Sequence, residues 1–508
     1  MSDTAPAPRP WGVFPPRSLF AVGRRDHPGM DLPAWRGEAV DAALPAALQR
    51  AAAPAIPSLS EPEAMRHFTR LSALNHHIER GMYPLGSCTM KYNPRLDEAV
   101  AALPGFARLH PAQDDADLQG LLCALKLLED ALCQVTGFAA CSLQPAAGAQ
   151  GELLGMKVIR AFHLSRGEPE RVEVLIPDSA HGTNPASVVI AGLKPVTIPS
   201  GPDGRLDPAA VRDAVGPATA GIMITNPNTL GLFETRIREV ADIVHAAGGR
   251  LYMDGANMNA ILGKALPSRM GFDVIHLNLH KTFATPHGGG GPGAGPVCVT
   301  EELRPFLPAP TIEERDGRFV LDWHPGEPRP RLHAWYGNVG VCLRALAYVL
   351  RVGRDGLPRV AERAVLNANY LRQQVEPLLP VPRGDRTLHE FVASGDAWKE
   401  RYGVRTLDIA KRLLDYGFHA PTIYFPLIVH EALMIEPTET ESRETLDAFA
   451  AALAAIRDEA ERDPELLRTA PHLTPVGRLD EARAARQPDL AWPEADVTEG
   501  DGAEGARA

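Results

Sequence analysis

The sequence contains no run of apolar residues long enough to cross a membrane, which takes about 20 residues in a helix. Its N-terminus, MSDTAPAPRPWGVFPPRS, has no apolar core behind a basic start, so it does not read as a secretory signal. Arg24 and Arg25 are followed by Asp26 and His27 rather than by an apolar stretch, which argues against a twin-arginine signal. We therefore expect a cytoplasmic protein without membrane contact.

The 6 cysteines form no CxxC pair and have no zinc-like spacing with histidine. In a chain of this size they are expected to be reduced thiols rather than a disulfide framework. No other residue set has metal-ligand spacing, so no metal is predicted. The net charge of −11 argues against nucleic acid as the main partner.

With 508 residues, the chain is too long for one simple core, and it contains no internal repeat. Apolar residues make up 45% and charged residues 23%, as in ordinary globular proteins. Changes in composition divide the chain into four predicted parts. These are an N-terminal arm with helices (1–105), a large α/β domain (106–334), a small C-terminal α+β domain (335–480) and a disordered acidic tail (481–508).

Short apolar runs alternate with helical patterns in the second part. Leucines at helical spacing over 118–135, closed by Gly137, predict the first helix. Strands joined by helices are typical of a mostly parallel sheet that is covered on both faces. The predicted strands are 172–178, 195–200, 220–227, 250–255, 273–279 and 296–300.

Helical patterns dominate the third part. They cover 335–351 and 406–417, and two apolar runs at 420–428 and 432–437 follow them. Thr438 and Glu441 have capping-box spacing before a helix expected over about 441–461.

An acid and an amine follow two successive predicted strands. Asp254 ends one of them and Lys281 follows the next. Ligands of open α/β sheets bind beyond the carboxyl ends of the strands. A pyridoxal-phosphate (PLP) enzyme needs a lysine for a Schiff base and an anion that keeps the pyridine nitrogen protonated. Simpler roles stay open, because a lysine often ends a strand in solvent and an aspartate often caps a helix.

Further candidates stand at other strand ends. His181 is either a polar loop residue or a ring that lies flat on the cofactor and moves protons. The segment 144–152, QPAAGAQGE, opens a helix whose small residues leave backbone N–H groups for a phosphate, although an ordinary helix start fits equally well. The glycine-rich run 287–293 allows a close approach to a ligand. For Cys88, within 81–91, we expect a buried and unreactive thiol.

Several long segments together resemble the C-terminal half of glycine decarboxylase, the P protein of the glycine cleavage system. The resemblance is closer still to the separately encoded second subunit of that enzyme. It spans roughly residues 60–460 in the order of the family. The matching segments are YPLGSCTMKYNPR, QPAAGAQGE, PDSAHGTNPAS, TNPNTLGLFE, MDGANMNA, NLHKTFATPHGGGGPGAGP, FHAPTIYFP and MIEPTETES.

The resemblance implies the type I PLP-dependent, aspartate aminotransferase-like α/β fold, with a mostly parallel sheet in the large domain. It also implies a role for each candidate. Lys281 would be the Schiff-base lysine, Asp254 the partner of the pyridine nitrogen and His181 the histidine that stacks on the ring. The backbone of Ala147, Gly148 and Ala149 would bind the phosphate, and Thr183 and Thr225 would add polar contacts.

The implied reaction decarboxylates glycine and passes the aminomethyl group to the lipoyl disulfide of the H protein. The single-chain form of the family is about twice this length. The resemblance therefore implies a homologous first subunit, in a heterotetramer with two copies of each.

Two alternatives stay open. One is another type I PLP enzyme, an aminotransferase or an amino-acid decarboxylase, which would normally show an arginine for the substrate carboxylate. Arg412 and Arg443 exist, but neither has a recognisable context. The other is a non-catalytic subunit of the same complex, against which the intact Lys281 and Asp254 argue.

Overall fold

The computed structural model describes residues 45–51, 57–288, 293–324, 329–333, 335–384 and 386–490, together with residues 19, 34, 36 and 37. Ile78–His472 forms one compact unit, and Met1–His77 with Leu473–Ala508 forms another. Within the described residues, no helix combines the length and apolar character that crossing a membrane requires.

In the described part of the second unit there are three helical elements. They are η2 (Ala46–Leu48), α2 (Glu61–Leu74) and α15 (Glu481–Arg486). A capping box begins α2, because the backbone N–H of Ser60 donates to Glu63 Oε2 at 2.9 Å. α15 lies inside the tail predicted to be disordered, so that prediction is wrong over this turn and a half. The rest of the tail from 491, and most of the arm before 57, lie outside the described residues.

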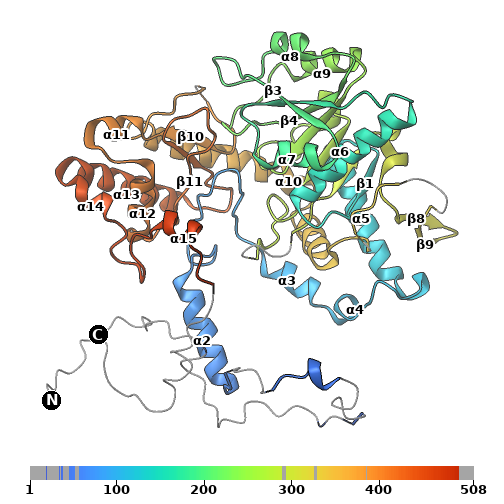
Figure 1. Ribbon diagram of the computed structural model, residues 1–508, viewed down its shortest axis with the longest axis horizontal. Coiled ribbons are helices and arrows are strands. Elements are labelled where there is room, and N and C mark those ends of the chain that lie inside the picture. Colours follow the sequence, from blue (N-terminus) through green and yellow to red (C-terminus); the bar gives the residue numbers. More distant parts are fainter. Residues whose placement is uncertain are drawn as a thin grey trace. The chain divides into compact units, whose positions relative to one another are not determined.

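A seven-stranded sheet forms the centre of the large unit, in the order β1-β7-β6-β5-β4-β2-β3 (Figure 1). β7 runs antiparallel to both of its neighbours and the other pairs are parallel. All six predicted strands are confirmed, whereas β1 was not predicted. The strands are β1 (Ala140–Ser142), β2 (Glu173–Pro177), β3 (Lys194–Ile198), β4 (Thr219–Thr225), β5 (Arg250–Gly255), β6 (Val274–Leu277) and β7 (Val297–Val299).

Helices cover both faces of this sheet. Val174 and Ile176 of β2 face one core and Leu175 faces the other, as strand alternation requires. The helices of the first core are α6 (Gly148–Ser165) and α7 (Thr183–Ile190). Those of the second are α5 (Gln119–Thr136), α8 (Pro208–Ala214), α9 (Ile237–Ala246) and part of α10 (Val339–Val375). Burial on both faces explains why the strands are apolar throughout rather than alternating.

The same unit, Ile78–His472, also contains a smaller part, which is built on a three-stranded antiparallel sheet in the order β10-β12-β11. Its elements are β10 (Phe391–Ser394), α11 (Asp396–Tyr402), α12 (Thr406–Asp415), β11 (Thr422–Ile423), β12 (Ala432–Ile435), α13 (Arg443–Arg462) and α14 (Pro464–Arg468). Only two residues of the apolar run 420–428 are a strand. The predicted cap of α13 is also wrong, because Ser442 accepts the N–H of Thr445, while Thr438 has a φ of 62°.

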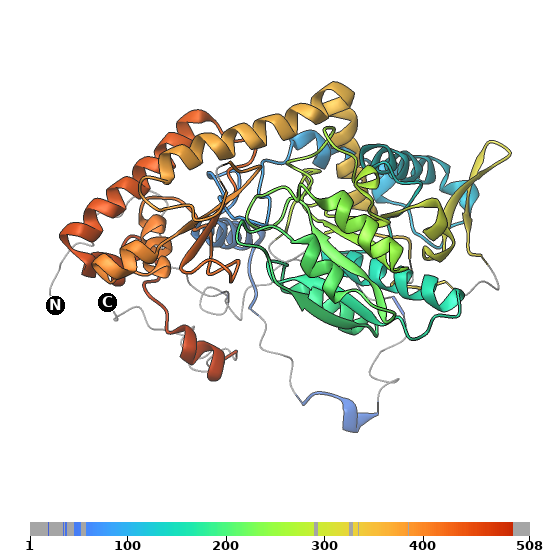
Figure 2. The same ribbon diagram turned by 90° about the horizontal axis from the view of Figure 1, so that it is seen from above.

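α10 joins the two parts of this unit (Figure 2). Its first half packs in the core of the large sheet, and Leu371 and Val375 of its second half pack in the core of the small one. Gly353, with a φ of 69°, interrupts the helical backbone between them. The helix begins at Val339, after the boundary predicted at 334, yet its first half still packs on the large sheet, so the two cores divide within α10 rather than before it.

The segment before α3 also reaches the small part. Leu85 forms an isolated antiparallel bridge with Ile435 of β12, and Met82 lies in the core of the small sheet. α3 (Arg95–Ala101) packs on α10 and leads to α4 (Pro104–Ala107). The remaining elements are η3 (Asp115–Asp117), η4 (Pro267–Met270), η5 (Glu301–Phe306) and the hairpin of β8 (Thr311–Arg315) and β9 (Arg318–Asp322).

Candidate active site

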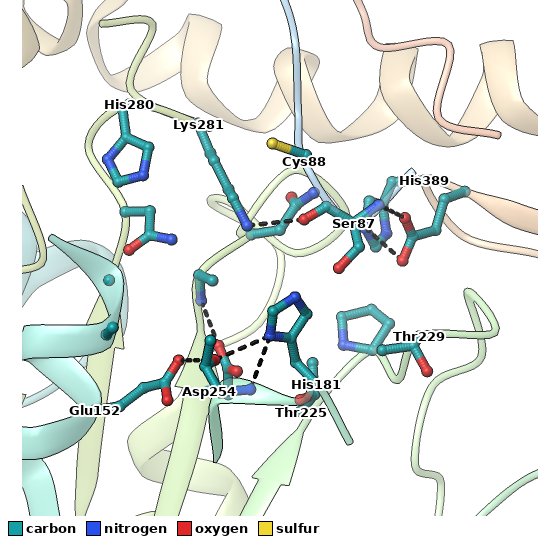
Figure 3. A pocket seen from close by; sticks show the side chains of 18 of the residues that line it. Ser87, Cys88, Glu152, His181, Thr225, Thr229, Asp254, His280, Lys281 and His389 are labelled. Carbon is teal, nitrogen blue, oxygen red and sulfur yellow. Dashed lines mark hydrogen bonds and ion pairs between the residues drawn. The ribbon is translucent and has the colours of Figure 1, made fainter. Parts of the chain in front are cut away.

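A pocket of about 240 Å³ lies beyond the carboxyl ends of the large sheet (Figure 3). It is lined by all of the predicted site residues except Ala147. Those residues are Lys281, Asp254, His181, Gly148, Ala149, Thr183 and Thr225. Ala147 is the N-cap residue of α6, where its carbonyl accepts the N–H of Gly151 at 3.0 Å.

Strand register places the acidic residue of the pocket. Asp254 is paired with Thr225 of β4 on one side and with His276 of β6 on the other. The three side chains therefore stand in one row across the sheet. Thr225 Oγ1 is buried and has no hydrogen-bond partner among the described residues, so it is available to a ligand.

One hydrogen bond and one nearby imidazole surround the Asp254 carboxylate. The N–H of Ala256 donates to Oδ1 at 3.1 Å, and Nε2 of His276 lies 3.6 Å from the same oxygen. His276 is fully buried, and Tyr252 Oη lies 2.6 Å from its Nδ1. Burial lowers the pKa of His276, so the imidazole stays neutral and orients Asp254 without cancelling its charge.

Lys281 lies on the opposite side of the pocket from Asp254 (Figure 3). Its Nζ donates to the backbone carbonyl of Ser87 at 2.8 Å. Ser87 has a φ of 64°, in the left-handed region that few non-glycine residues adopt. Its own N–H donates to Glu390 Oε2 at 2.6 Å. The backbone of Ser87 thus connects the amine of Lys281 to a buried carboxyl group.

A second buried carboxyl group lies beside the first. Glu436 accepts from Thr89 Oγ1 at 2.6 Å and from Asn257 Nδ2 at 2.9 Å. Burial raises the pKa of Glu436 to about 7, and burial together with Glu436 raises the pKa of Glu390 well above its usual value. His389 joins them, and one ligand-type atom of each of the three residues lies within 4.8 Å of the others. The amine of Lys281 faces this group. Its attraction opposes part of the rise in both pKa values but does not cancel it.

The N-terminus of α6 forms the floor of the pocket. The first N–H groups of a helix have no partner inside it and favour an anion. A Cβ on Gly148 would lie 2.6 Å from Asn278 Oδ1, so only glycine allows this close approach. Asn278 Oδ1 is itself buried without a partner among the described residues. A phosphate bound at Gly148 and Ala149 fits the free backbone N–H groups, whereas Asn278 Oδ1 is an acceptor and needs a donor.

His181 and the glycine-rich segment lie as the sequence suggested. His181 lines the pocket from the loop before α7, where burial and Lys281 lower its pKa. Gly288 has a φ of 65°, and a Cβ on Gly293 would lie 2.9 Å from His280 Nδ1. The close approach at Gly293 is to the side chain of His280, so the predicted approach to a ligand stays a prediction, and residues 289–292 lie outside the described residues.

Cys88 lies in the pocket rather than in the core. Its thiol is only partly buried, and Sγ lies 3.7 Å from His287 Nδ1. Burial raises the pKa of Cys88 and outweighs the attraction of Lys281. Burial and Lys281 together lower the pKa of His287 to about 4. The thiol is therefore protonated at neutral pH, and the expectation of a fully buried residue is wrong.

Both candidate arginines lie away from the pocket. Arg412 donates to Glu459 at 2.9 and 2.8 Å and to Asp415 at 2.9 Å. Arg443 donates to Tyr370 Oη at 3.1 Å. No arginine is among the described residues that line the pocket.

Several residues that line the pocket, and Glu436 behind it, were given no role in the sequence analysis. Glu152 and Glu436 fall inside segments that carried the family resemblance, but they were given no role. His389 and Glu390 follow an irregular segment, and nothing in their spacing pointed to the pocket. Asn278 lies near the end of the predicted strand 273–279, so its place at a strand end is the one signal that could have identified it.

The comparisons with known proteins agree with one another. A family model described as "Glycine dehydrogenase, C-terminal domain" matches residues 360–472. A "Probable glycine dehydrogenase (decarboxylating) subunit 2" of Thermococcus onnurineus is 52% identical and covers 93% of this chain and 95% of its own length. A protein of the same name from Caldanaerobacter subterraneus subsp. tengcongensis is 55% identical, with coverages of 86% and 90%.

A solved structure shares the fold. It is the inhibitor-bound glycine decarboxylase (P-protein) of the glycine cleavage system, which has a TM-score of 0.69 and 20% identity. The match covers 82% of this chain and 94% of that one.

Proposed function

Because this chain belongs to the glycine dehydrogenase (decarboxylating) subunit 2 family, we propose that it removes the carboxyl group of glycine with PLP and passes the aminomethyl group to the lipoyl group of an H protein. The chain has the type I PLP-dependent fold. One observation supports the proposal above the others. Lys281, Asp254 and the N-terminus of α6 come from separate elements and meet in one pocket.

The bound cofactor would supply an electron sink for the bond that breaks at the substrate Cα. Asp254 would keep the pyridine nitrogen protonated, and His276 and Tyr252 would hold its carboxylate in place. The N–H groups of Gly148 and Ala149 would bind the phosphate.

Lys281 would attach the cofactor covalently until the amine of glycine displaces it. The displaced Nζ has a defined resting place on the carbonyl of Ser87, with Glu390 on the far side of that residue. Lys281 would thus stay close enough to return when the product leaves.

The pocket favours a small substrate. Its volume of about 240 Å³ has to hold the cofactor as well as the substrate, which leaves little room beyond a small amino acid. An aminotransferase would normally offer an arginine to the substrate carboxylate, and Arg412 and Arg443 are both engaged elsewhere. These two features favour glycine decarboxylation over the alternative PLP chemistries.

The relatives are named as a second subunit, which implies a first one. We propose that this partner is homologous to the present chain, that the complex holds two copies of each, and that it delivers the product to lipoylated H protein. Light scattering on the co-expressed subunits would measure the stoichiometry, and a mass other than that of four chains would contradict it.

An exchange assay tests the reaction directly. Labelled bicarbonate is incubated with glycine, the first subunit, H protein and this chain loaded with PLP. We expect label in the glycine carboxyl group, and none when this chain is omitted. Absence of exchange together with transamination of other amino acids would favour the aminotransferase alternative. A chain that takes up no PLP would favour the non-catalytic one.

A further inference from the structure

A chain of hydrogen bonds connects a buried carboxyl group to His181 (Figure 3). Thr183 Oγ1 lies 2.7 Å from Glu152 Oε1 and 2.9 Å from His181 Nδ1. The other carboxyl oxygen, Oε2, accepts from Ser187 Oγ at 2.9 Å. Glu152 lies on α6, whereas both hydroxyl groups lie on α7. A single hydroxyl group therefore separates Glu152 from the imidazole.

Glu152 exists in both protonation states near neutral pH. Its side chain is 5% exposed, and burial together with the nearby charge of Asp254 raises its pKa to about 7. Three groups oppose this shift, namely the hydroxyls of Thr183 and Ser187 and the more distant charge of Lys281. Tyr252 of β5 also faces Glu152, and its phenol stays protonated because burial raises its pKa.

The state of Glu152 determines the direction of every hydrogen bond in the chain. When Glu152 is ionised, the hydroxyl of Thr183 donates to it, so the oxygen of that hydroxyl can only accept from His181 Nδ1. When Glu152 is protonated, it donates to Thr183, whose hydroxyl then turns and donates to Nδ1. The backbone N–H of Thr183 lies 3.3 Å from Nδ1 and can donate to it only in this second state, in which Nδ1 carries no proton.

We propose that Glu152 is a positioning residue that selects, through Thr183, which ring nitrogen of His181 carries the proton. With Glu152 ionised, the proton is on Nδ1, and Nε2 presents a lone pair. With Glu152 protonated, the proton is on Nε2. Nε2 has no hydrogen-bond partner among the described residues, and the ring lines the pocket. The groups that face the ring from other elements are Asp254, Lys281 and the ring of Phe425.

The consequence for the reaction rests on the proposed function. After carbon dioxide leaves glycine, the remaining carbon must attack a sulfur of the lipoyl disulfide rather than take a proton. A proton moved from His181 Nε2 to that carbon would form a C–H bond and release methylamine. His181 would regain its proton at Nδ1 from Glu152 through Thr183. An Nε2 without a proton prevents this side reaction, so ionised Glu152 protects aminomethyl transfer.

The tautomer of His181 can be measured without any turnover. The full-length chain, labelled with ¹⁵N-histidine and free of cofactor, is titrated from pH 6.5 to 8.5, and His181→Asn identifies the signals. We expect the proton to move from Nε2 to Nδ1 around pH 7. A wild-type His181 that keeps one tautomer over this range would overturn the proposal.

Four variants separate the relay from simple packing of α7 on α6. In Glu152→Gln the amide donates to Thr183 at every pH, so the proton should stay on Nε2. Thr183→Val should abolish the pH response, whereas Thr183→Ser, which keeps the hydroxyl, should restore it. Ser187→Ala is the matched control, because it removes a bond to Glu152 outside the relay. It should keep the response with a higher midpoint, and equal effects of Ser187→Ala and Thr183→Val would contradict the relay.

A second measurement addresses the chemistry. PLP-loaded enzyme with the first subunit and glycine, but without lipoyl acceptor, should release methylamine about 10-fold faster at pH 6 than at pH 8, because only protonated Glu152 can resupply Nδ1. Glu152→Gln has no proton to pass on and should lose this pH dependence, whereas Ser187→Ala should keep it. Wild-type release that does not change with pH, beside a tautomer that does, would overturn the protective role alone. If no variant decarboxylates glycine, the proposed function fails, while the titration still decides the relay.

Discussion

The amine of Lys281 lies 2.8 Å from the backbone carbonyl of Ser87, a residue 194 positions earlier in the chain. The two residues come from different matching segments, and the fold brings them to one side of the pocket. Ser87 has no side-chain role in this contact. Its left-handed backbone points the carbonyl at Lys281 and the N–H at Glu390.

Lys281→Ala should abolish covalent binding of the cofactor. The wild-type chain with PLP should show a visible absorption band that borohydride removes, leaving a stable label on Lys281. The variant should show neither the band nor the label. Lys264→Ala is the control, since this exposed lysine pairs with Glu362 away from the pocket. A variant that is still labelled at another lysine would contradict the assignment.

Asp254→Asn should weaken binding of PLP about 10- to 100-fold, because a charge-assisted contact is worth ~1.5–3 kcal/mol. His276→Phe should weaken it less, since Asp254 keeps the bond from Ala256. Titration of the apo chain with PLP, followed by tyrosine and tryptophan fluorescence, measures both effects. The exposed Asp242 on α9 supplies the control variant Asp242→Asn. Equal affinity in Asp254→Asn and wild type would remove Asp254 from the site.

Gly148→Ala should displace the N-terminus of α6. The added Cβ would meet Asn278 Oδ1 at 2.6 Å, so one of the two must move. We expect PLP to bind about 10-fold more weakly, while inorganic phosphate competes less well for the site. Gly120→Ala is matched to it, because a Cβ there meets nothing within 4 Å. That control should leave PLP binding unchanged and stabilise α5 by ~0.5–1 kcal/mol.

Stability should fall with rising pH because of Glu436. Its pKa is raised from 4.5 to about 7 in the folded chain, so the folded state holds this proton more tightly than the unfolded state. The resulting stabilisation is complete below about pH 4.5 and is lost as the pH rises to about 7. Glu436→Gln should therefore be more stable than wild type by about 1–3 kcal/mol at pH 8, and similar to it at pH 5.

Urea unfolding of the cofactor-free chain at both pH values would measure this difference. Glu461→Gln is the control, because that glutamate is exposed. A Glu436→Gln variant that loses stability equally at pH 5 and pH 8 would show that packing, not ionisation, dominates at this position.

The site residues that could be predicted from the sequence are those that stand at the ends of regular strands. Asp254 and Lys281 follow apolar runs, and the end of such a run marks the edge of the sheet where ligands bind. The register of Thr225, Asp254 and His276 was not predictable, because pairing between strands is a tertiary property.

The other half of the pocket could not be predicted for a related reason. Ser87, His389 and Glu390 lie outside regular periodic segments, and only the packing of the small sheet brings them to Lys281. Only two residues of the apolar run 420–428 form a strand, because apolar composition alone does not supply a partner strand. The fold class could be predicted from the local pattern of apolar residues. The charged groups around Lys281 could not, because contacts between residues distant in sequence bring them there.

The bond between Thr89 and Glu436 joins residues 347 positions apart. The bridge between Leu85 and Ile435 lies beside it. During synthesis, the segment around Ser87 leaves the ribosome early, but its partner strand β12 emerges only near the end of translation. The large sheet can form before then, whereas the side of the pocket where Ser87 contacts Lys281 cannot. The chain should consequently acquire the capacity to bind its cofactor late in folding, after most of its secondary structure is in place.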